Sequence, residues 1–178
     1  QQVNMELFEK KIKTQGNKSA PLADRMRLRN IEEVVGQRHL LGAGKFITRL
    51  IEKKGLLSLI LWGTPGAGKT TFVREWVRRH APNLAKQVVS PTFILHARYD
   101  LPGGAVHHMD WYRLNSESDV LSLGWEDILN ESYQTIFVEW ADKFPGLLPK
   151  NHLEIRFKHV FGPVRRSIVV HRRGGRIR

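Results

Sequence analysis

The sequence predicts an α/β protein, a three-layer sandwich built on a mixed and partly antiparallel sheet. An apolar run at 57–62 predicts a buried strand, and it passes through a glycine-rich turn into an amphipathic helix. A second β-branched run, 135–138, predicts another buried strand and ends in a carboxylate. Two alternating segments, 153–159 and 165–171, flank a Phe-Gly-Pro turn and predict a hairpin. Buried strands joined by helices, with antiparallel pairs beside them, define this fold class.

The turn after the first strand carries the phosphate-binding pattern G-x-x-x-x-G-K-[ST] at Gly63, Gly68, Lys69 and Thr70. Its glycines allow several backbone N–H groups to face one phosphate, and the positive end of the next helix adds to the attraction. We expect Lys69 to reach the β- and γ-phosphates and Thr70 to offer its hydroxyl to Mg²⁺. The pattern therefore predicts a P-loop nucleoside triphosphatase fold that binds ATP. The predicted nucleotide-binding residues of this loop are Gly63, Thr64, Pro65, Gly66, Ala67, Gly68, Lys69, Thr70 and Thr71.

Composition narrows the possible classes of protein. The chain has 178 residues, enough for one domain with a sizeable core, and no apolar run approaches the roughly 18–20 residues that span a bilayer. It contains no cysteine, which excludes disulfides and thiol catalysis and fits an expected cytoplasmic location without membrane partners. The formal net charge of +12 favours a polyanionic partner, first of all nucleic acid. A basic surface that serves solubility, or an acidic protein partner, is the alternative.

Four segments are expected along the chain. Residues 1–20 are polar and lysine-rich and are interpreted as a flexible N-terminal arm. Residues 21–56 contain short apolar-periodic stretches that predict a helical leader. Residues 57–171 form the nucleotide-binding domain, and 172–178 form a basic tail.

Within the nucleotide-binding domain, apolar spacing and turn residues predict the remaining elements. Ser116 is a suitable N-cap for a helix, and the stretch 100–104 has the composition of a hairpin turn. The predicted elements are a helix over 71–79, a strand over 87–89, a hairpin of 94–99 with 105–109, and short helices over 117–123 and 124–129.

Phosphoryl transfer requires cradled phosphates, a held Mg²⁺ ion and a water or acceptor placed in line. Three residues are the catalytic candidates: Lys69, Asp110 and Glu139. Thr70 and the strand-end Glu139 are the predicted Mg²⁺ contacts. Asp110 would hold a metal-bound water or orient the attacking water, or it caps a turn. Thr92 would sense the γ-phosphate, or its hydroxyl satisfies a turn.

Two adjacent histidines, His107 and His108, invite a metal-site interpretation. Neighbouring residues of a strand face opposite sides, which makes them poor joint ligands, so zinc is not expected. His108 is interpreted as a structural group or as one that supports a catalytic residue. Trp140 would stack on a base or fill an interface, or it packs in the core.

The leader resembles the opening of RarA/MgsA-type AAA+ ATPases, which are recombination-associated relatives of clamp loaders. In that family the segment equivalent to Val34, Val35 and Gly36 lies beside the adenine, so the resemblance implies a base-binding role for these residues, with packing on the core as the alternative. The motifs that carry the resemblance are Pro21-Leu22-Ala23-Asp24-Arg25-Met26-Arg27, Val34-Val35-Gly36-Gln37, Leu40-Leu41-Gly42 and Ser58-Leu59-Ile60-Leu61-Trp62-Gly63.

From the P-loop onward the chain is similar to the TsaE family. The motifs that carry this resemblance are the stretch Gly66–Arg74, Ser90-Pro91-Thr92-Phe93, His108-Met109-Asp110-Trp111-Tyr112-Arg113, Glu139-Trp140 and Leu147-Leu148-Pro149. The resemblance implies an ATPase that works with TsaB and TsaD, whose hydrolysis drives turnover of a tRNA-modifying complex and which meets tRNA through that complex. A low intrinsic rate is expected because no arginine finger is visible. The chain thus resembles a hybrid joined at the P-loop.

Three alternatives stay open at this point. An AAA+ ATPase of DNA replication or recombination would carry an Asp-Glu pair on the second strand, where the chain has Glu139-Trp140. A non-catalytic, nucleotide-gated adaptor would bind ATP without hydrolysing it. A small-molecule kinase would share the loop, but no acceptor pocket can be recognised in the sequence.

Overall fold

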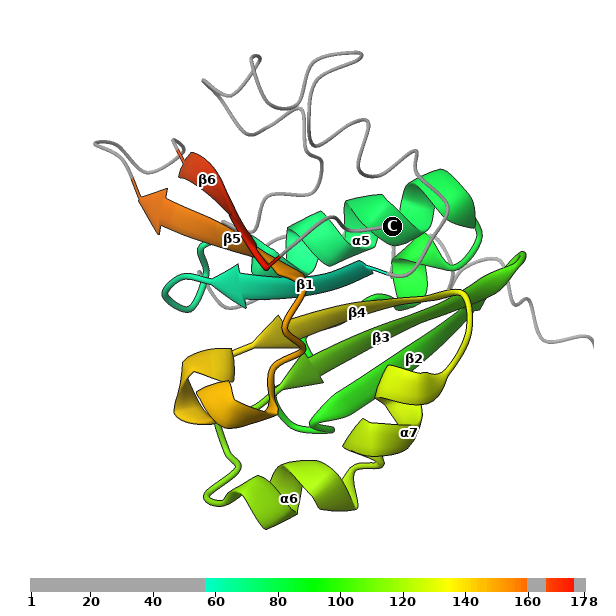
Figure 1. The fold of residues 1–178 in the computed structure, drawn as a ribbon. Helices are drawn as coiled ribbons and strands as arrows, with labels where there is room; N and C mark the ends of the chain where they lie inside the picture. Colours follow the sequence, from blue (N-terminus) through cyan, green and yellow to red (C-terminus); the bar gives the residue numbers. More distant parts are fainter. Residues whose placement is uncertain (1–56, 160–165, 175–178) are drawn as a thin grey trace, which may run out of the picture.

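The structure is a computed structural model, and it describes residues 57–159 and 166–174 (Figure 1). The expected N-terminal arm and the helical leader lie outside the described residues, as do Val35, Gly36 and the last four residues of the basic tail.

A six-stranded sheet forms the centre of the molecule, in the order β2-β3-β4-β1-β5-β6. The four inner strands run parallel, while β2 and β6 lie antiparallel at the two edges. This arrangement confirms the predicted mixed, partly antiparallel sheet. The strands are β1 (Leu57–Trp62), β2 (His96–Leu101), β3 (Gly104–Asp110), β4 (Gln134–Glu139), β5 (His152–His159) and β6 (Arg166–Arg173).

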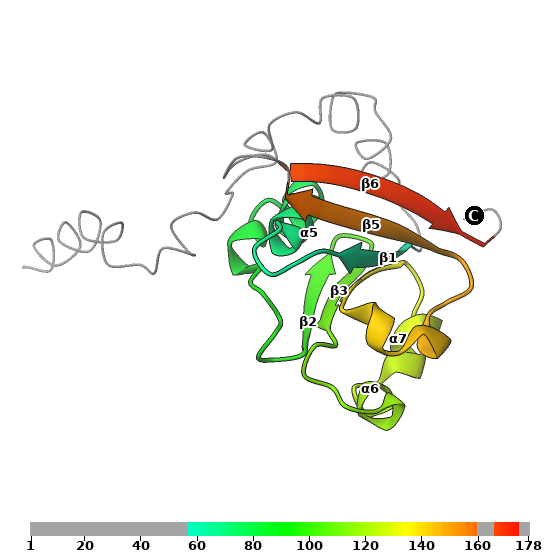
Figure 2. The same ribbon diagram turned by 90° about the vertical axis from the view of Figure 1, so that its left-hand side faces the viewer.

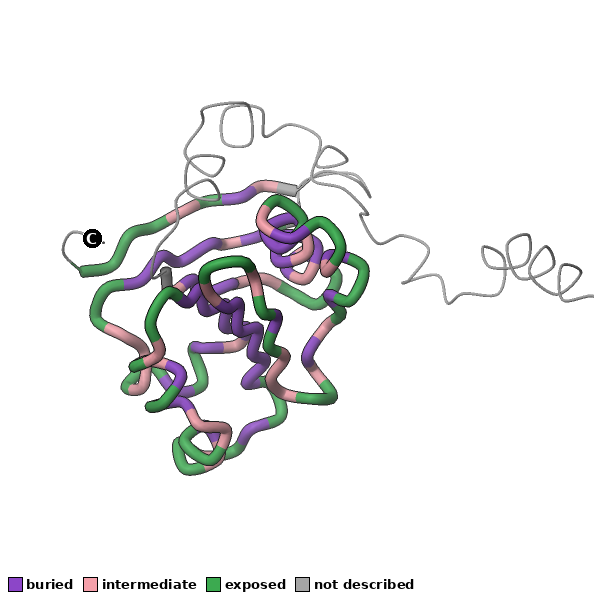
Figure 3. Tube along the Cα trace, turned by 90° about the vertical axis from the view of Figure 1, so that its right-hand side faces the viewer, coloured by how far each residue is buried: buried purple, intermediate pink, exposed green. Residues whose placement is uncertain are grey.

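Helices cover both faces of the sheet and complete the three layers (Figure 1). One face packs against α5 (Lys69–His80), and the other lies on the side of α6 (Glu117–Ser122) and α7 (Trp125–Asn130). Each face has its own apolar core, so buried residues run along the inner strands on both sides (Figure 3). Trp76 anchors the core under α5, and Trp125 anchors the core on the other face.

Local sequence explains the helix boundaries. Gly68 precedes α5 with a φ of 101°, a left-handed conformation that glycine adopts without strain. Ser116 caps α6 through a capping box with Asp119, as its residue type predicts. Two short 3₁₀ helices after β4, η3 (Ala141–Lys143) and η4 (Pro145–Leu147), keep the chain close to the second core.

The predicted strand over 87–89 is wrong. Residues Ala85–Gln87 form a 3₁₀ turn, η2, and Val88 follows it fully buried. The Val88 carbonyl accepts hydrogen bonds of 3.2 and 2.9 Å from the guanidinium of Arg74, so it is engaged by a side chain rather than a neighbouring strand. The apolar character of the segment therefore reflects burial and not sheet pairing.

Two strand ends differ from the predicted ones. The hairpin strand expected from residue 94 begins at His96, because Leu95 has a left-handed φ of 65° that interrupts the extended backbone. At the other edge, β6 continues to Arg173, two residues into the segment interpreted as a tail. Within residues 57–159 and 166–174, no helix is long and apolar enough to cross a membrane.

Candidate nucleotide-binding site

The loop between β1 and α5 has the backbone of a phosphate cradle. Gly63 has a φ of 150°, and a β-carbon there would lie 2.8 Å from the Phe157 carbonyl oxygen, so only glycine fits. Gly66 is also left-handed, with a φ of 76°. The Ala67 N–H donates to the Thr64 carbonyl over 3.1 Å and closes the loop. The sequence therefore folds this turn around open backbone N–H groups, as a phosphate site requires.

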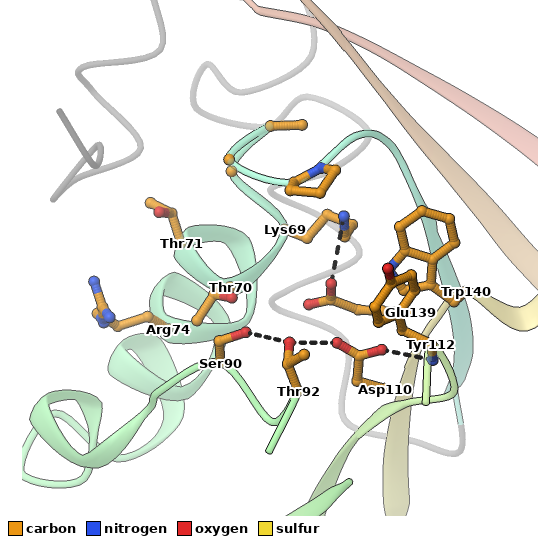
Figure 4. Close-up of a pocket in the computed structure, with 14 residues that line it drawn as sticks. Lys69, Thr70, Thr71, Arg74, Ser90, Thr92, Asp110, Tyr112, Glu139 and Trp140 are labelled. Carbon is orange, nitrogen blue, oxygen red and sulfur yellow. Dashed lines mark hydrogen bonds and ion pairs between the residues drawn. The ribbon is translucent and has the colours of Figure 1, made fainter. Parts of the chain in front are cut away.

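A cavity of about 320 Å³ opens beside this loop (Figure 4). It is bounded by the loop, the first turns of α5, the segment before β2, and the carboxyl ends of β3 and β4. Ligands of α/β proteins bind at this edge of the sheet. The lining residues are Pro65, Gly66, Ala67, Gly68, Lys69, Thr70, Thr71, Arg74, Ser90, Thr92, Asp110, Tyr112, Glu139 and Trp140.

The Lys69 ammonium group lies against its own loop. Its Nζ donates to the Gly63 carbonyl over 2.6 Å and to the Thr64 carbonyl over 3.3 Å, and it pairs with Glu139 Oε2 at 3.4 Å. The side chain is buried, so these contacts are strong but exchangeable for phosphate oxygens of higher charge. Lys69 thus lies between its own loop and Glu139 at the cavity, and its contact with the β- and γ-phosphates stays a prediction.

Glu139 is the strand-end carboxylate of β4, and its two oxygens contact two different side chains. Lys69 contacts Oε2, while His108 Nε2 donates to Oε1 over 3.0 Å. His108 is fully buried on β3, and its Nδ1 has no hydrogen-bond partner among the described residues. With one oxygen fixed by His108, the other faces Lys69 and the cavity (Figure 4).

Asp110 lies beside Glu139 because β3 and β4 pair in parallel with these two residues in register. Its Oδ2 accepts a hydrogen bond of 2.6 Å from the Thr92 hydroxyl, and its Oδ1 accepts one of 2.9 Å from the Tyr112 N–H. The Thr92 hydroxyl also lies 3.0 Å from that of Ser90 (Figure 4). Asp110 therefore caps the turn after β3 and also ties the segment of Ser90 and Thr92 to the cavity.

Trp140 follows Glu139 in a left-handed conformation, with a φ of 58°. Its ring lies 5.0 Å from the Tyr112 ring, and the Lys69 Nζ lies 5.8 Å from its centre. Strain of this kind at a non-glycine residue clusters at functional sites. The two rings form one wall of the cavity, and Trp140 also packs against the core on the side of α6 and α7, so its stacking on a base stays a prediction.

The sequence patterns do not indicate two residues that hold the segments around the cavity. Lys143 Nζ donates to the Tyr112 and Leu114 carbonyls and so fixes the turn that carries Tyr112. Arg74 holds the Val88 carbonyl and, through it, the segment that leads to the cavity. Arg74 stands four residues after Thr70, on the same side of a helix, and that spacing was the available signal.

The two adjacent histidines point to opposite faces, as expected. His107 contacts His96 Nε2 through Nδ1 and Glu131 through Nε2, both over 3.0 Å, away from Glu139. Burial and then the neighbouring His107 lower the pKa of His96 from 6.5 to about 4. Burial also lowers the pKa of His107, although Glu131 opposes the shift. In the described part of the chain, no group of three His, Asp or Glu side chains gathers that could hold a metal ion.

The donor set at the cavity suits a hard divalent cation. The Thr70 hydroxyl and the carboxylates of Glu139 and Asp110 are all oxygen donors at one cavity, and Mg²⁺ prefers oxygen ligands with several retained waters. Thr70 and Glu139 are the residues that would hold the ion, with Asp110 beside them. The phosphate cradle, the buried lysine and the strand-end carboxylates together define a P-loop nucleotide-binding protein of the ATPase type.

The chain belongs to the TsaE family. The family model described as "Threonylcarbamoyl adenosine biosynthesis protein TsaE" matches residues 34–168. The tRNA threonylcarbamoyladenosine biosynthesis protein TsaE of Rickettsia typhi is 35% identical over 100 residues, covering 56% of this chain and 67% of that protein. The resemblance stated from the motifs after the P-loop is thus confirmed.

A second group of relatives matches a shorter stretch. Replication-associated recombination protein A of Escherichia coli K12 is 52% identical over 65 residues, which cover 36% of this chain and 14% of that protein. Among solved structures, the crystal structure of Bacillus subtilus YdiB aligns with a TM-score of 0.51 and 23% identity, covering 70% of this chain and 73% of that one. This structural likeness supports the P-loop fold alone.

Proposed function

We propose that this protein is a Mg²⁺-dependent ATPase that supports threonylcarbamoyladenosine modification of tRNA together with TsaB and TsaD. The observation that carries the proposal is the convergence of Lys69, Glu139 and Asp110 on one cavity beside the P-loop. The family and its named relatives support the pathway. The protein would act in the cytoplasm and meet tRNA through the complex.

Each residue has a distinct task in this proposal. Residues Gly63–Thr71 bind the phosphates, with Lys69 exchanging its loop carbonyls for the β- and γ-phosphate oxygens. A bound Mg²⁺ ion would neutralise developing charge on the phosphates. Thr70 and Glu139 would hold that ion, and Asp110 would orient a water. Thr92, bonded to Asp110, would respond to the γ-phosphate.

We expect a low intrinsic rate of ATP hydrolysis from the arginines that line the cavity. Arg74 is the one arginine that lines the cavity in the described part of the chain, and its guanidinium donates to the Val88 carbonyl. Stabilisation of transferred phosphoryl charge by an added arginine contributes roughly 10³- to 10⁵-fold in related chemistry. A partner protein would supply such an arginine or bring one of this chain into place.

The rim of the cavity suits a protein partner. Phe93 is 83% exposed directly after Thr92, and Tyr112 is 55% exposed beside Trp140. The Arg113 guanidinium lies 5.9 Å from the Phe93 ring. Exposed aromatic and arginine side chains are typical of interface anchors. A partner bound here would touch the segment that holds Asp110.

The test is hydrolysis by the full chain, alone and with a TsaB–TsaD mixture. We expect slow basal hydrolysis that needs Mg²⁺, stimulation by the mixture, and a loss of about 100-fold in Glu139→Gln. Glu126→Gln on α7 is the matched control, an exposed glutamate away from the cavity, and should hydrolyse normally. Unchanged hydrolysis in Glu139→Gln would indicate the non-catalytic adaptor, and stimulation by DNA instead of TsaB–TsaD would indicate the recombination-type ATPase.

A further inference from the structure

The positive charge of the chain is concentrated near its C-terminus. Residues 150–178 contain nine lysines and arginines and one acidic residue, Glu154. Residues 114–142 contain seven acidic residues and no lysine or arginine. The chain's surplus of positive charge is therefore not spread evenly, and most of it belongs to the segment that forms β5 and β6.

The structure gathers part of this charge on one face of the β5–β6 hairpin. Arg156 and Lys158 alternate with Phe157, which is buried in the core under α5, so both point to the opposite face. Across the hairpin, Val169 pairs with Arg156 and is 39% exposed. On this side of the sheet, α6 and α7 lie near β2, β3 and β4 rather than near β5 and β6 (Figures 1 and 2).

Only part of the positive charge on this face is neutralised. Glu154 is shared by two arginines, with Arg156 Nη2 at 3.1 Å and Arg173 Nε at 2.9 Å. The Arg156 and Arg173 side chains remain 40% and 58% exposed, and Lys158 is exposed. Glu154 is thus paired with two of the three cations, which leaves the face attractive to a polyanion.

An aromatic hollow adjoins this basic face. The Arg156 guanidinium lies 5.1 Å from the centre of the Trp62 ring, and Trp62 with Trp140 lines a hollow of about 200 Å³. Trp62 Nε1 and Arg156 Nε are buried donors without a hydrogen-bond partner in the described residues. Asp142 at the same hollow offers an acceptor. Basic side chains beside aromatic rings are the combination that binds single-stranded nucleic acid, where bases stack and phosphates pair.

We infer that the face formed by Trp62, Arg156, Lys158, Val169 and Arg173 binds a single-stranded segment of RNA. The phosphates lie along Arg156, Lys158 and Arg173, and one base enters the hollow of Trp62 and Trp140. The choice of RNA over other polyanions rests on the proposed function in tRNA modification. The contact would make the protein a direct RNA ligand and not only a companion of an RNA-binding complex.

The test is fluorescence anisotropy of the full chain with a labelled 20-nucleotide single-stranded RNA of mixed sequence. We expect Lys158→Glu and Val169→Glu each to weaken binding by about fivefold or more, and Val169→Lys to strengthen it. Lys158→Ala should also reduce the slope of log K against log salt by about 0.7. Trp62→Leu should weaken binding by roughly 5- to 150-fold, the range that base stacking gives.

Two matched controls separate this face from general charge effects. Lys86→Glu changes an exposed lysine at η2, and Leu121→Glu changes an apolar residue of α6 that is 41% exposed, close to the 39% of Val169. Both should bind RNA as the unmodified chain does. Equal effects of these controls and of the face variants would overturn the inference.

Three further arms distinguish the occupant and the proposed function. Equal affinity for single-stranded DNA of the same sequence, or displacement of the RNA by polyglutamate at equal charge, would overturn RNA as the occupant. ATP hydrolysis is measured on the same preparations. Normal, Glu139-dependent hydrolysis without RNA binding would refute this inference and leave the proposed function standing, whereas RNA binding without hydrolysis would refute only the proposed function.

Discussion

The contact between His108 and Glu139 gives a sharp prediction, because its loss should impair hydrolysis far more than folding. His108→Leu removes the buried Nε2–H donor that lies 3.0 Å from Glu139 Oε1. A hydrogen bond to a charged group contributes about 1.5–3 kcal/mol. The same substitution removes His108 Nδ1, a buried atom that has no partner within residues 57–159 and 166–174 and whose burial costs about 1–3 kcal/mol.

These two contributions oppose each other, so the free energy of unfolding should change by at most about 2 kcal/mol. That corresponds to a shift in the melting temperature of under about 8 °C for a chain of this length. Hydrolysis should respond differently. Without His108 the Glu139 carboxylate can turn toward Lys69, and a displacement of about 1 Å at a reacting centre costs roughly 100-fold in rate.

The assay is steady-state ATP hydrolysis at several Mg²⁺ concentrations, with thermal unfolding of the same samples. We expect kcat to fall by about 10- to 100-fold in His108→Leu, and His108→Gln, which keeps an N–H donor, to recover part of it. His152→Leu is the matched control, since His152 is also buried with one bonded ring nitrogen, at 2.7 Å from the Pro149 carbonyl. A normal kcat in His108→Leu, or an equal loss in His152→Leu, would refute the reasoning.

Three other substitutions test the cavity and its frame. Thr92→Val removes the hydroxyl that donates to Asp110 over 2.6 Å. The rate of hydrolysis should fall about tenfold, while the affinity for ATP should stay within about twofold. Steady-state kinetics and nucleotide titration measure the two quantities. The pKa of His96 is lowered to about 4 by burial and by His107, so below pH 6.5 the unfolded chain binds the extra proton first and stability falls as the pH drops from about 6.5 toward 4. His96→Phe should flatten this part of a urea-unfolding series against pH, and a curve parallel to that of the unmodified chain would exclude the mechanism. Gly104→Ala would drive its β-carbon into the carbonyl of the residue before β4 and should destabilise the chain by about 1–3 kcal/mol in urea, with an unchanged midpoint as the contrary result.

The sequence predicted the parts of the site that depend on chain-local patterns. The phosphate loop with Lys69 follows from spacing, and Glu139 follows from its place at the end of an apolar run. The contact of His108 with Glu139 could not be predicted, since it depends on the register between β3 and β4. Val88 was misassigned to a strand because burial alone gives a segment an apolar composition, whether or not its backbone joins a sheet.

The parallel register of Asp110 and Glu139 also limits which insertions and deletions this chain can tolerate. Side chains of a strand alternate between its faces, so one residue inserted within β3 or β4 would turn a carboxylate away from the cavity. The lengths of these two strands are therefore under chemical constraint. The connection between them, residues 111–133, carries α6 and α7. Its Tyr112 N–H donates a hydrogen bond to the Asp110 carboxylate. Insertions beyond that turn would leave the register of β3 and β4 intact, so we expect this connection to tolerate changes in length.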